Sequence, residues 1–172
     1  MPSTSDVFRA TSTAAPGILP TVALPSGHAL VLLPMLWLPA WVSLSTTHRA
    51  AKLPADLVLA VIEVESRGNP SAHSSARAAG LMQGLPATLA ALLPDIRGAD
   101  PFDPPQNVRA GILYLDEAVR RHEGDVHWAL AGYNAGIPTS LRARTGEARL
   151  YGESTEFVSR VLALLSLVGP HV

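Results

Sequence analysis

The sequence contains no cysteine among its 172 residues. This excludes disulfide bonds, thiol catalysis and cysteine-ligated zinc sites together. Charged residues make up only 16% of the chain and hydrophobic residues 48%, a composition that is apolar but still globular. The 13 basic residues form no polybasic block, and the formal net charge is −1. Because nothing here attracts a polyanion, we expect no nucleic-acid partner.

Metal ligands with a recognisable spacing are also lacking. None of the six histidines forms an HExxH pair, so a zincin-type metal site is not expected. His122 and His127 are five residues apart, which places them on different sides of a helix. We therefore predict that these two histidines are solvated and that they bind no metal.

The N-terminal part differs in composition from the rest of the chain. Residues 1–27 are rich in serine, threonine, proline, alanine and glycine, and we predict that they are unstructured. Residues 29–44 form an uncharged apolar run, shorter than the about 20 residues of a membrane span and interrupted by two prolines. Small residues at its end favour a secretory signal cleaved after Ser45. An uncleaved anchor and an ordinary packed segment are the alternatives.

The chain is thus predicted to divide into residues 1–50, a disordered N-terminus with a signal peptide or anchor, and residues 51–172, the domain. In the domain, apolar residues recur at helical spacing and no alternating run of strand length occurs. We predict an all-α domain of about six short helices. They lie between Pro54 and Gly68, around 79–83, and at 87–93, 106–122, 126–135 and 155–168, with loops at 94–105 and 139–153.

One carboxylate lies on the apolar face of its helix. Glu65 follows the apolar Val58 and Val61 by seven and four residues, which is the spacing of one helical stripe. Burial raises the pKa of a carboxyl group, and a carboxyl that keeps its proton near neutral pH is suited to be the general acid of glycosidic cleavage. Periodicity alone favours the ordinary explanation, a glutamate that reaches solvent or pairs with Arg67.

Four blocks of sequence add a context to Glu65. The first contains Glu65-Ser66-Arg67-Gly68-Asn69-Pro70 and Gly80-Leu81-Met82-Gln83, the second Asp103-Pro104-Pro105-Gln106-Asn107-Val108, and the third Ala129-Leu130-Ala131-Gly132-Tyr133-Asn134-Ala135-Gly136. A weaker fourth block is Glu153-Ser154 with Phe157-Val158. Each block alone is unspecific, but their order and gaps over about residues 53–162 resemble the soluble lytic transglycosylase (SLT) family.

This resemblance implies a lysozyme-like, mostly helical fold with a groove for glycan. It implies that Glu65 is the catalytic residue and that no metal or organic cofactor is required. The residues that match substrate-binding positions of the family are Ser74, Met82, Gln83, Tyr133 and Asn134. Without the resemblance, Met82 is explained as a core side chain and Tyr133 as a buried ring with a bonded hydroxyl.

The chain departs from the family pattern at several places. Arg77 stands where the family commonly has glycine, and Phe157 stands where a tyrosine is common. Gly84-Leu85 replaces a bulkier pair, and Ile137 stands where proline often follows. None of these changes touches Glu65, so they bear on substrate preference more than on activity.

The function that the resemblance implies is that of a lytic transglycosylase, a carbon–oxygen lyase acting on peptidoglycan glycan strands. It would cleave the β-1,4 bond between N-acetylmuramic acid and N-acetylglucosamine and leave 1,6-anhydro ends. We expect an exported, monomeric protein of the periplasm or cell envelope, anchored by residues 29–44 if these are retained, that opens the wall for a secretion or conjugation machine. The alternatives are a goose-type lysozyme, which hydrolyses the bond, and a non-catalytic peptidoglycan-binding assembly protein.

Overall fold

The computed structural model describes residues 21–23, 29–31 and 53–168, and the chain divides into two units, Met1–Leu36 and Trp37–Val172. In the first unit, strand β1 (Thr21–Ala23) pairs with strand β2 (Ala29–Val31) in antiparallel register, with Val22 opposite Leu30. The prediction that residues 1–27 are unstructured is therefore wrong for β1.

The remaining N-terminal predictions lie mostly outside the described residues. Only β2 belongs to the apolar run at 29–44, so the signal or anchor, and the boundary between a leader and a domain, stay predictions. None of the helices in the described ranges combines the length and the apolar character needed to cross a bilayer.

Helix α2 (Ala55–Ser66) begins directly after Pro54 and ends at Arg67, as the sequence pattern predicts. Asp56 lies in the first turn, near the positive end of the helix dipole. One face of the helix is buried through Leu57, Val58, Val61 and Ile62. Arg67 adopts a left-handed φ of 52°, which ends the helix and leaves Glu65 in its last turn.

Residues 79–83 do not form the helix that we predicted. They make a turn that is held by isolated β-bridges from Ala79 to His73 and to Gly84. Gly80 and Gln83 have left-handed φ angles of 78° and 47°, which a right-handed helix does not accept. A Cβ on Gly80 would collide with the carbonyl oxygen of Pro101, so the close approach of the two loops requires glycine.

Helices α3 (Pro86–Leu92) and α4 (Pro104–Arg121) confirm two further predictions and begin with proline. Proline is favourable there because the first N–H groups of a helix have no partner within it. The Asp103 carboxylate caps α4, accepting a hydrogen bond of 3.0 Å from the backbone N–H of Gln106. The two helices pack against each other around Leu89, Leu93 and Ala110.

The last three helices are α5 (Val126–Ala135), α6 (Ile137–Arg144) and α7 (Gly152–Val168). Helix α5 has the predicted bounds, and α7 begins slightly earlier than predicted. The prediction of an irregular segment at 139–153 is wrong for residues 139–144, which belong to α6. Gly136, with a φ of 86°, redirects the chain, and Pro138 lies in the first turn of a new helix instead of ending the previous one.

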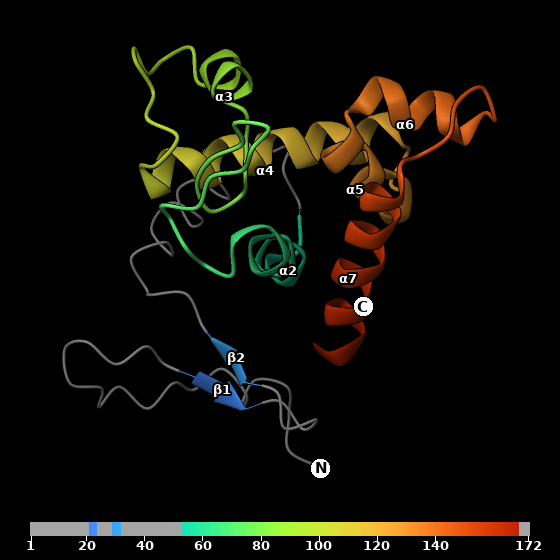
Figure 1. Cartoon of the computed structure of the whole chain (residues 1–172), viewed down its shortest axis with the longest axis horizontal. Helices are drawn as coiled ribbons and strands as arrows, with labels where there is room; N and C mark the ends of the chain where they lie inside the picture. The colour runs from blue at the N-terminus through green and yellow to red at the C-terminus, as the bar shows by residue number, and fades with distance from the viewer. Residues whose placement is uncertain (1–20, 24–28, 32–52, 169–172) are drawn as a thin grey trace. The chain divides into compact units, whose positions relative to one another are not determined.

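Helix α5 is the centre of the C-terminal packing, since it contacts α4, α6 and α7. Helix α7 returns to contact α2, and Figure 1 shows α2 nearly end-on, below α4 and beside α7. This return brings the last helix of the described chain to the helix that carries Glu65.

His122 is buried, contrary to the prediction that it is solvated. It ends α4 with an exposed fraction of 0%, and its Nε2 lies 2.7 Å from the Ser140 hydroxyl of α6. A Cβ on Gly132 of α5 would lie 3.2 Å from that nitrogen, so the three helices meet at this point. The spacing of the histidines did not predict this burial, because the residues that cover His122 are distant from it in sequence.

Candidate active site

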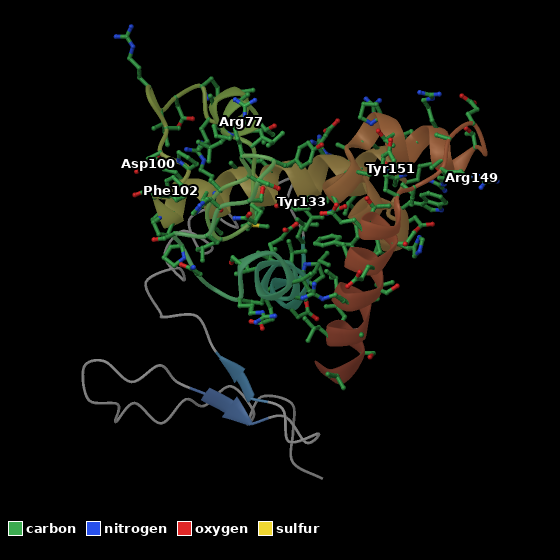
Figure 2. The ribbon with its side chains drawn as sticks, in the orientation of Figure 1. Arg77, Asp100, Phe102, Tyr133, Arg149 and Tyr151 are labelled. Carbon is green, nitrogen blue, oxygen red and sulfur yellow. The ribbon has the colours of Figure 1, made fainter. Side chains whose placement is uncertain are left out.

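A pocket of about 390 Å³ is lined by helices α2, α3, α4, α5 and α7 and by the loop between α2 and α3. Its lining includes most of the residues that the sequence predicts for the site, namely Glu65, Ser74, Gln83, Tyr133 and Asn134. Figure 2 shows Tyr133 near the middle of the helical unit, between α2 and α4 in this view.

Glu65 is half-buried at the wall of this pocket. Burial raises the pKa of Glu65 from its ordinary 4.5 to about 7, the Glu153 carboxylate adds to the rise, and Arg160 opposes it. Within the described ranges Glu65 forms no ion pair, so the alternative of a pair with Arg67 is not realised. A carboxyl group with this pKa holds its proton in a large fraction of molecules at neutral pH and is able to donate it.

Tyr133 lies next to the acid and is fixed on three sides. Its hydroxyl donates a hydrogen bond of 2.7 Å to the carbonyl oxygen of Met82. Its ring stacks on Phe157, with centroids 6.2 Å apart, and tilts against Tyr114 at 5.7 Å. Burial raises the pKa of Tyr133, and the nearby Glu65 adds to this, so the phenol stays protonated. Phe157 loses the hydroxyl of the family pattern but keeps the ring that holds Tyr133.

Met82 does not line the pocket, and the prediction that its side chain contacts glycan is wrong. The side chain is 0% exposed and fills the core against Gly111. The backbone of Met82 supports the site instead. Its N–H donates to Asn107 Oδ1 at 2.8 Å, and its carbonyl accepts a hydrogen bond from the Tyr133 hydroxyl. Met82 therefore connects the loop to α4 and α5 from beneath the pocket.

Gln83 lines the pocket, but its amide nitrogen is occupied. Nε2 donates to the carbonyl oxygens of Gly80 and Ala72, at 2.8 and 3.1 Å, and so uses both of its hydrogens. The amide oxygen of Gln83 is the atom left to accept a hydrogen bond from a ligand. These two bonds also hold the left-handed backbone of Gln83 in place.

Asn134 and Ser74 line the pocket through side chains that bond to the protein. Asn134 Oδ1 accepts a hydrogen bond of 2.7 Å from the Ser154 hydroxyl of α7, which leaves the Asn134 amide nitrogen as a donor. The Ser74 oxygen accepts from the backbone N–H of Ala78 at 3.1 Å and shapes the loop. Ser74 and Glu65 thus share the pocket, while the bond of Ser74 goes to its own loop.

Two residues that the structure brings to the site were not predicted as site residues from the sequence. Glu153 lines the pocket from the start of α7 and adds a second carboxylate to it, although the weak fourth block contained this residue. Asn107 is buried and satisfied on both sides, since its Nδ2 donates to the carbonyls of Ala79 and Pro101, each at 2.8 Å. It fixes the loop that carries Met82 and Gln83, and it belongs to the second block.

Comparison with known proteins extends these observations. Residues 45–152 match the Transglycosylase SLT domain family. The chain is 31% identical over 128 residues to a transglycosylase of Enterobacteria phage PRD1, covering 74% of this chain and 43% of that protein. It is 34% identical over 112 residues to a membrane-bound lytic murein transglycosylase C of Mannheimia succiniciproducens, covering 58% of this chain and 28% of the relative.

The solved structures share the fold. The lytic transglycosylase Slt of Pseudomonas aeruginosa, in an inactive mutant form, superposes with a TM-score of 0.66 at 24% identity, over 80% of this chain and 24% of that one. This confirms the predicted fold class. The chain spans less than half the length of these curated relatives and about a quarter of that solved structure. Because the family match extends over more than half of its residues, the chain belongs to the Transglycosylase SLT domain family.

Proposed function

We propose that the protein is a lytic transglycosylase that cleaves the β-1,4 bond between N-acetylmuramic acid and N-acetylglucosamine in peptidoglycan. The observation that carries the proposal is Glu65, a half-buried carboxyl with a pKa of about 7 in the wall of a pocket of about 390 Å³. The family match and the murein transglycosylases among the relatives supply the substrate class.

In the proposed reaction Glu65 acts first as an acid and then as a base. It donates its proton to the bridging oxygen, and the bond from that oxygen to C1 of N-acetylmuramic acid breaks. The acetamido group of the sugar stabilises the positive charge that develops at C1. The Glu65 carboxylate then takes the proton of the 6-hydroxyl, whose oxygen bonds to C1. The product is a 1,6-anhydro end, and no water is consumed.

Tyr133 and Asn134 are proposed to position the sugar beside Glu65. The Tyr133 hydroxyl donates its hydrogen bond to the Met82 carbonyl, so its oxygen is available as an acceptor at the pocket. The Asn134 amide nitrogen is a donor from the same helix, held by its bond to Ser154. Gln83 and Ser74 complete the polar wall from the loop.

A goose-type lysozyme reaction is the second candidate, and Glu153 is the observation that favours it. A second carboxylate in the pocket is a group that is able to activate water on the far side of the sugar. The two reactions differ in their products, because hydrolysis adds a water molecule of about 18 Da and lysis does not.

The test is digestion of peptidoglycan sacculi by the purified full chain, with mass spectrometry of the soluble muropeptides. We expect anhydro products about 18 Da lighter than their hydrated counterparts, which are the products of hydrolysis. Glu65→Gln is expected to lower turnover by about 10²- to 10⁴-fold while binding to sacculi is retained. Glu63→Gln, on the same helix but outside the pocket lining, is the matched control and should keep full turnover.

The other possible results of this experiment lead to different conclusions. Reducing ends that disappear in Glu65→Gln would assign the lysozyme reaction, with Glu65 still the acid. Substantial cleavage by Glu65→Gln would reject Glu65 as the acid. Binding to sacculi without any product from the wild type would support the non-catalytic assembly protein.

We further propose that the protein acts as a monomer at the cell envelope, exported or anchored through residues 29–44, and opens the wall for a secretion or conjugation machine. A relative named as membrane-bound is consistent with this place. Fractionation of cells into periplasm and membrane, with the mature N-terminus determined by mass spectrometry, tests the location. Recovery of the full chain in the cytoplasm would contradict it.

A further inference from the structure

The charged side chains that line the pocket are all acidic. Glu65 and Glu153 contribute carboxylates, and no lysine, arginine or histidine is among the lining residues in the described part of the chain. An anionic substrate would therefore meet repulsion at this wall. A cation stands just outside this lining, because Arg77 lies in the loop between two lining residues, Ala76 and Ala78.

The backbone of the loop holds Arg77 in a fixed position at the pocket edge. The Ser74 N–H donates to the Ala78 carbonyl at 2.9 Å, and the Arg77 N–H donates to the Ser74 carbonyl at 3.0 Å. Arg77 has a left-handed φ of 66°, a conformation that glycine adopts more easily. Its side chain is exposed and takes part in no ion pair within the described ranges.

The same loop carries an exposed apolar side chain. The N–H of Ala79, two residues after Arg77, donates to the carbonyl of Gly84 at 3.1 Å, which brings the loop next to Leu85. Leu85 lines the pocket and is 48% exposed, although large apolar side chains are usually covered. Figure 2 labels Arg77, whose side chain is exposed, on the loop between α2 and α3.

We propose that Arg77 and Leu85 form a binding site for the peptide stem of the glycan strand. The inference rests on the proposed function, since the occupant is the lactyl-linked peptide of N-acetylmuramic acid. That stem carries free carboxylates, which match an unpaired guanidinium, and alanine methyl groups, which match an exposed leucine. The site gives the carboxylates of the stem a cationic partner at the edge of a pocket whose charged lining residues are both acidic.

The test compares two soluble glycan fragments of equal length, one with peptide stems and one from which an amidase has removed them. Wild type, Arg77→Gly, Arg77→Lys and Arg142→Ala are measured as full chains, for KM and kcat on both fragments. Arg77→Gly removes the cation and suits the left-handed backbone, so folding is retained. Arg142 is exposed on α6 and does not line the pocket, which makes it the matched control.

We expect Arg77→Gly to raise KM for the fragment with stems by about fivefold, the size of a good exposed charge pair. Its kcat, and its KM for the fragment without stems, should stay unchanged. Arg77→Lys should recover part of the loss, and higher salt should reduce the preference for stems in the wild type. Leu85→Asn should raise KM for the fragment with stems more than for the fragment without them.

Equal effects of Arg77→Gly on both fragments would overturn the stem site, because the arginine would then act on the sugar or on the fold. No effect on either fragment would overturn it as well. Dissociation constants measured in a Glu65→Gln background separate this result from failure of the proposed function. A preference for stems that depends on Arg77 in binding, without products from the wild type, would keep the site and reject the lyase.

Discussion

At the scale of single residues, the charges around Glu65 set the pH at which it is able to work. The acid must be protonated, and its pKa is about 7, so kcat/KM should fall as pH rises through about 7. Glu153→Gln removes a like charge and should move this alkaline limb to lower pH. Arg160→Ala removes an opposite charge and should move it to higher pH. Rate–pH profiles of the three proteins test this, and shifts in the same direction would contradict it.

The same carboxyl should reduce the stability of the folded protein. A folded-state pKa raised above the ordinary 4.5 means that ionisation is harder in the folded chain than in the unfolded one. The stability cost therefore begins as pH rises above 4.5 and is complete above about 7. Glu65→Gln should melt at a higher temperature than wild type at pH 8 and at nearly the same temperature at pH 4. Thermal denaturation followed by circular dichroism at the two pH values measures the difference.

Residue types and order located most of the pocket residues, while the direction of each side chain depended on contacts between distant segments. Spacing alone placed Glu65 on the apolar face of its helix, and the resemblance to the SLT family identified it as the catalytic residue. Met82 was misplaced because its environment comes from α4, where Gly111 leaves room for its side chain. Glu153 was not assigned because only the packing of α7 on α2 brings it near Glu65.

At the scale of elements, the helices with strong end signals were predictable, and the errors at 79–83 and 139–144 arose where the local signal depends on a neighbouring segment. Asp103 and Pro104 mark the start of α4, and Gly136 marks the end of α5. Proline often ends a helix, yet Pro138 lies in the first turn of α6. At Gly80 glycine permits a tertiary approach that excludes a helix. In both cases the local signal is ambiguous until the neighbouring segment is known.

The contact of α4 with the loop is tested by Gly111→Ala. A Cβ at this position would collide with the Met82 side chain and lie 2.8 Å from the Met82 Cβ, so the loop must move. Overpacking of this kind costs about 1–3 kcal/mol, partly offset by the better helix propensity of alanine. We expect a lower melting temperature and lower turnover, because Met82 also holds Tyr133.

Gly84→Ala is the control for this change. A Cβ at Gly84 meets nothing within 4 Å, so its melting temperature should stay close to that of the wild type. Equal melting temperatures for Gly111→Ala and the wild type would show that the loop yields to the new methyl group.

At the scale of the whole molecule, buried His122 should make stability depend on pH in the acid range. Burial lowers the pKa of His122 from its ordinary 6.5, and Arg144 adds to this. The Nδ1 atom of His122 has no hydrogen-bond partner among the described residues, so a proton there would be unsatisfied. As pH falls below 6.5, the unfolded chain takes up a proton that the folded chain resists, and the free energy of unfolding decreases.

Glu65→Gln is the right background for this measurement, because Glu65 has the opposite pH dependence. We expect the melting temperature of Glu65→Gln to fall as the pH is lowered from 7 to 5. Titration of the His122 imidazole by NMR should give a midpoint below 6.5 in the folded protein. A midpoint at or above 6.5 would contradict the prediction.

The bond from Tyr133 to Met82 joins residues that are 51 positions apart, which has a consequence for synthesis of the chain. The ribosome completes α2, and with it Glu65, long before it makes α5 and α7. Until those helices emerge and dock, Glu65 has neither Tyr133 nor Glu153 beside it, and no walled pocket desolvates it. Contacts of such long range also form late in folding. The proposed wall-cutting activity is therefore expected to begin only with the finished domain.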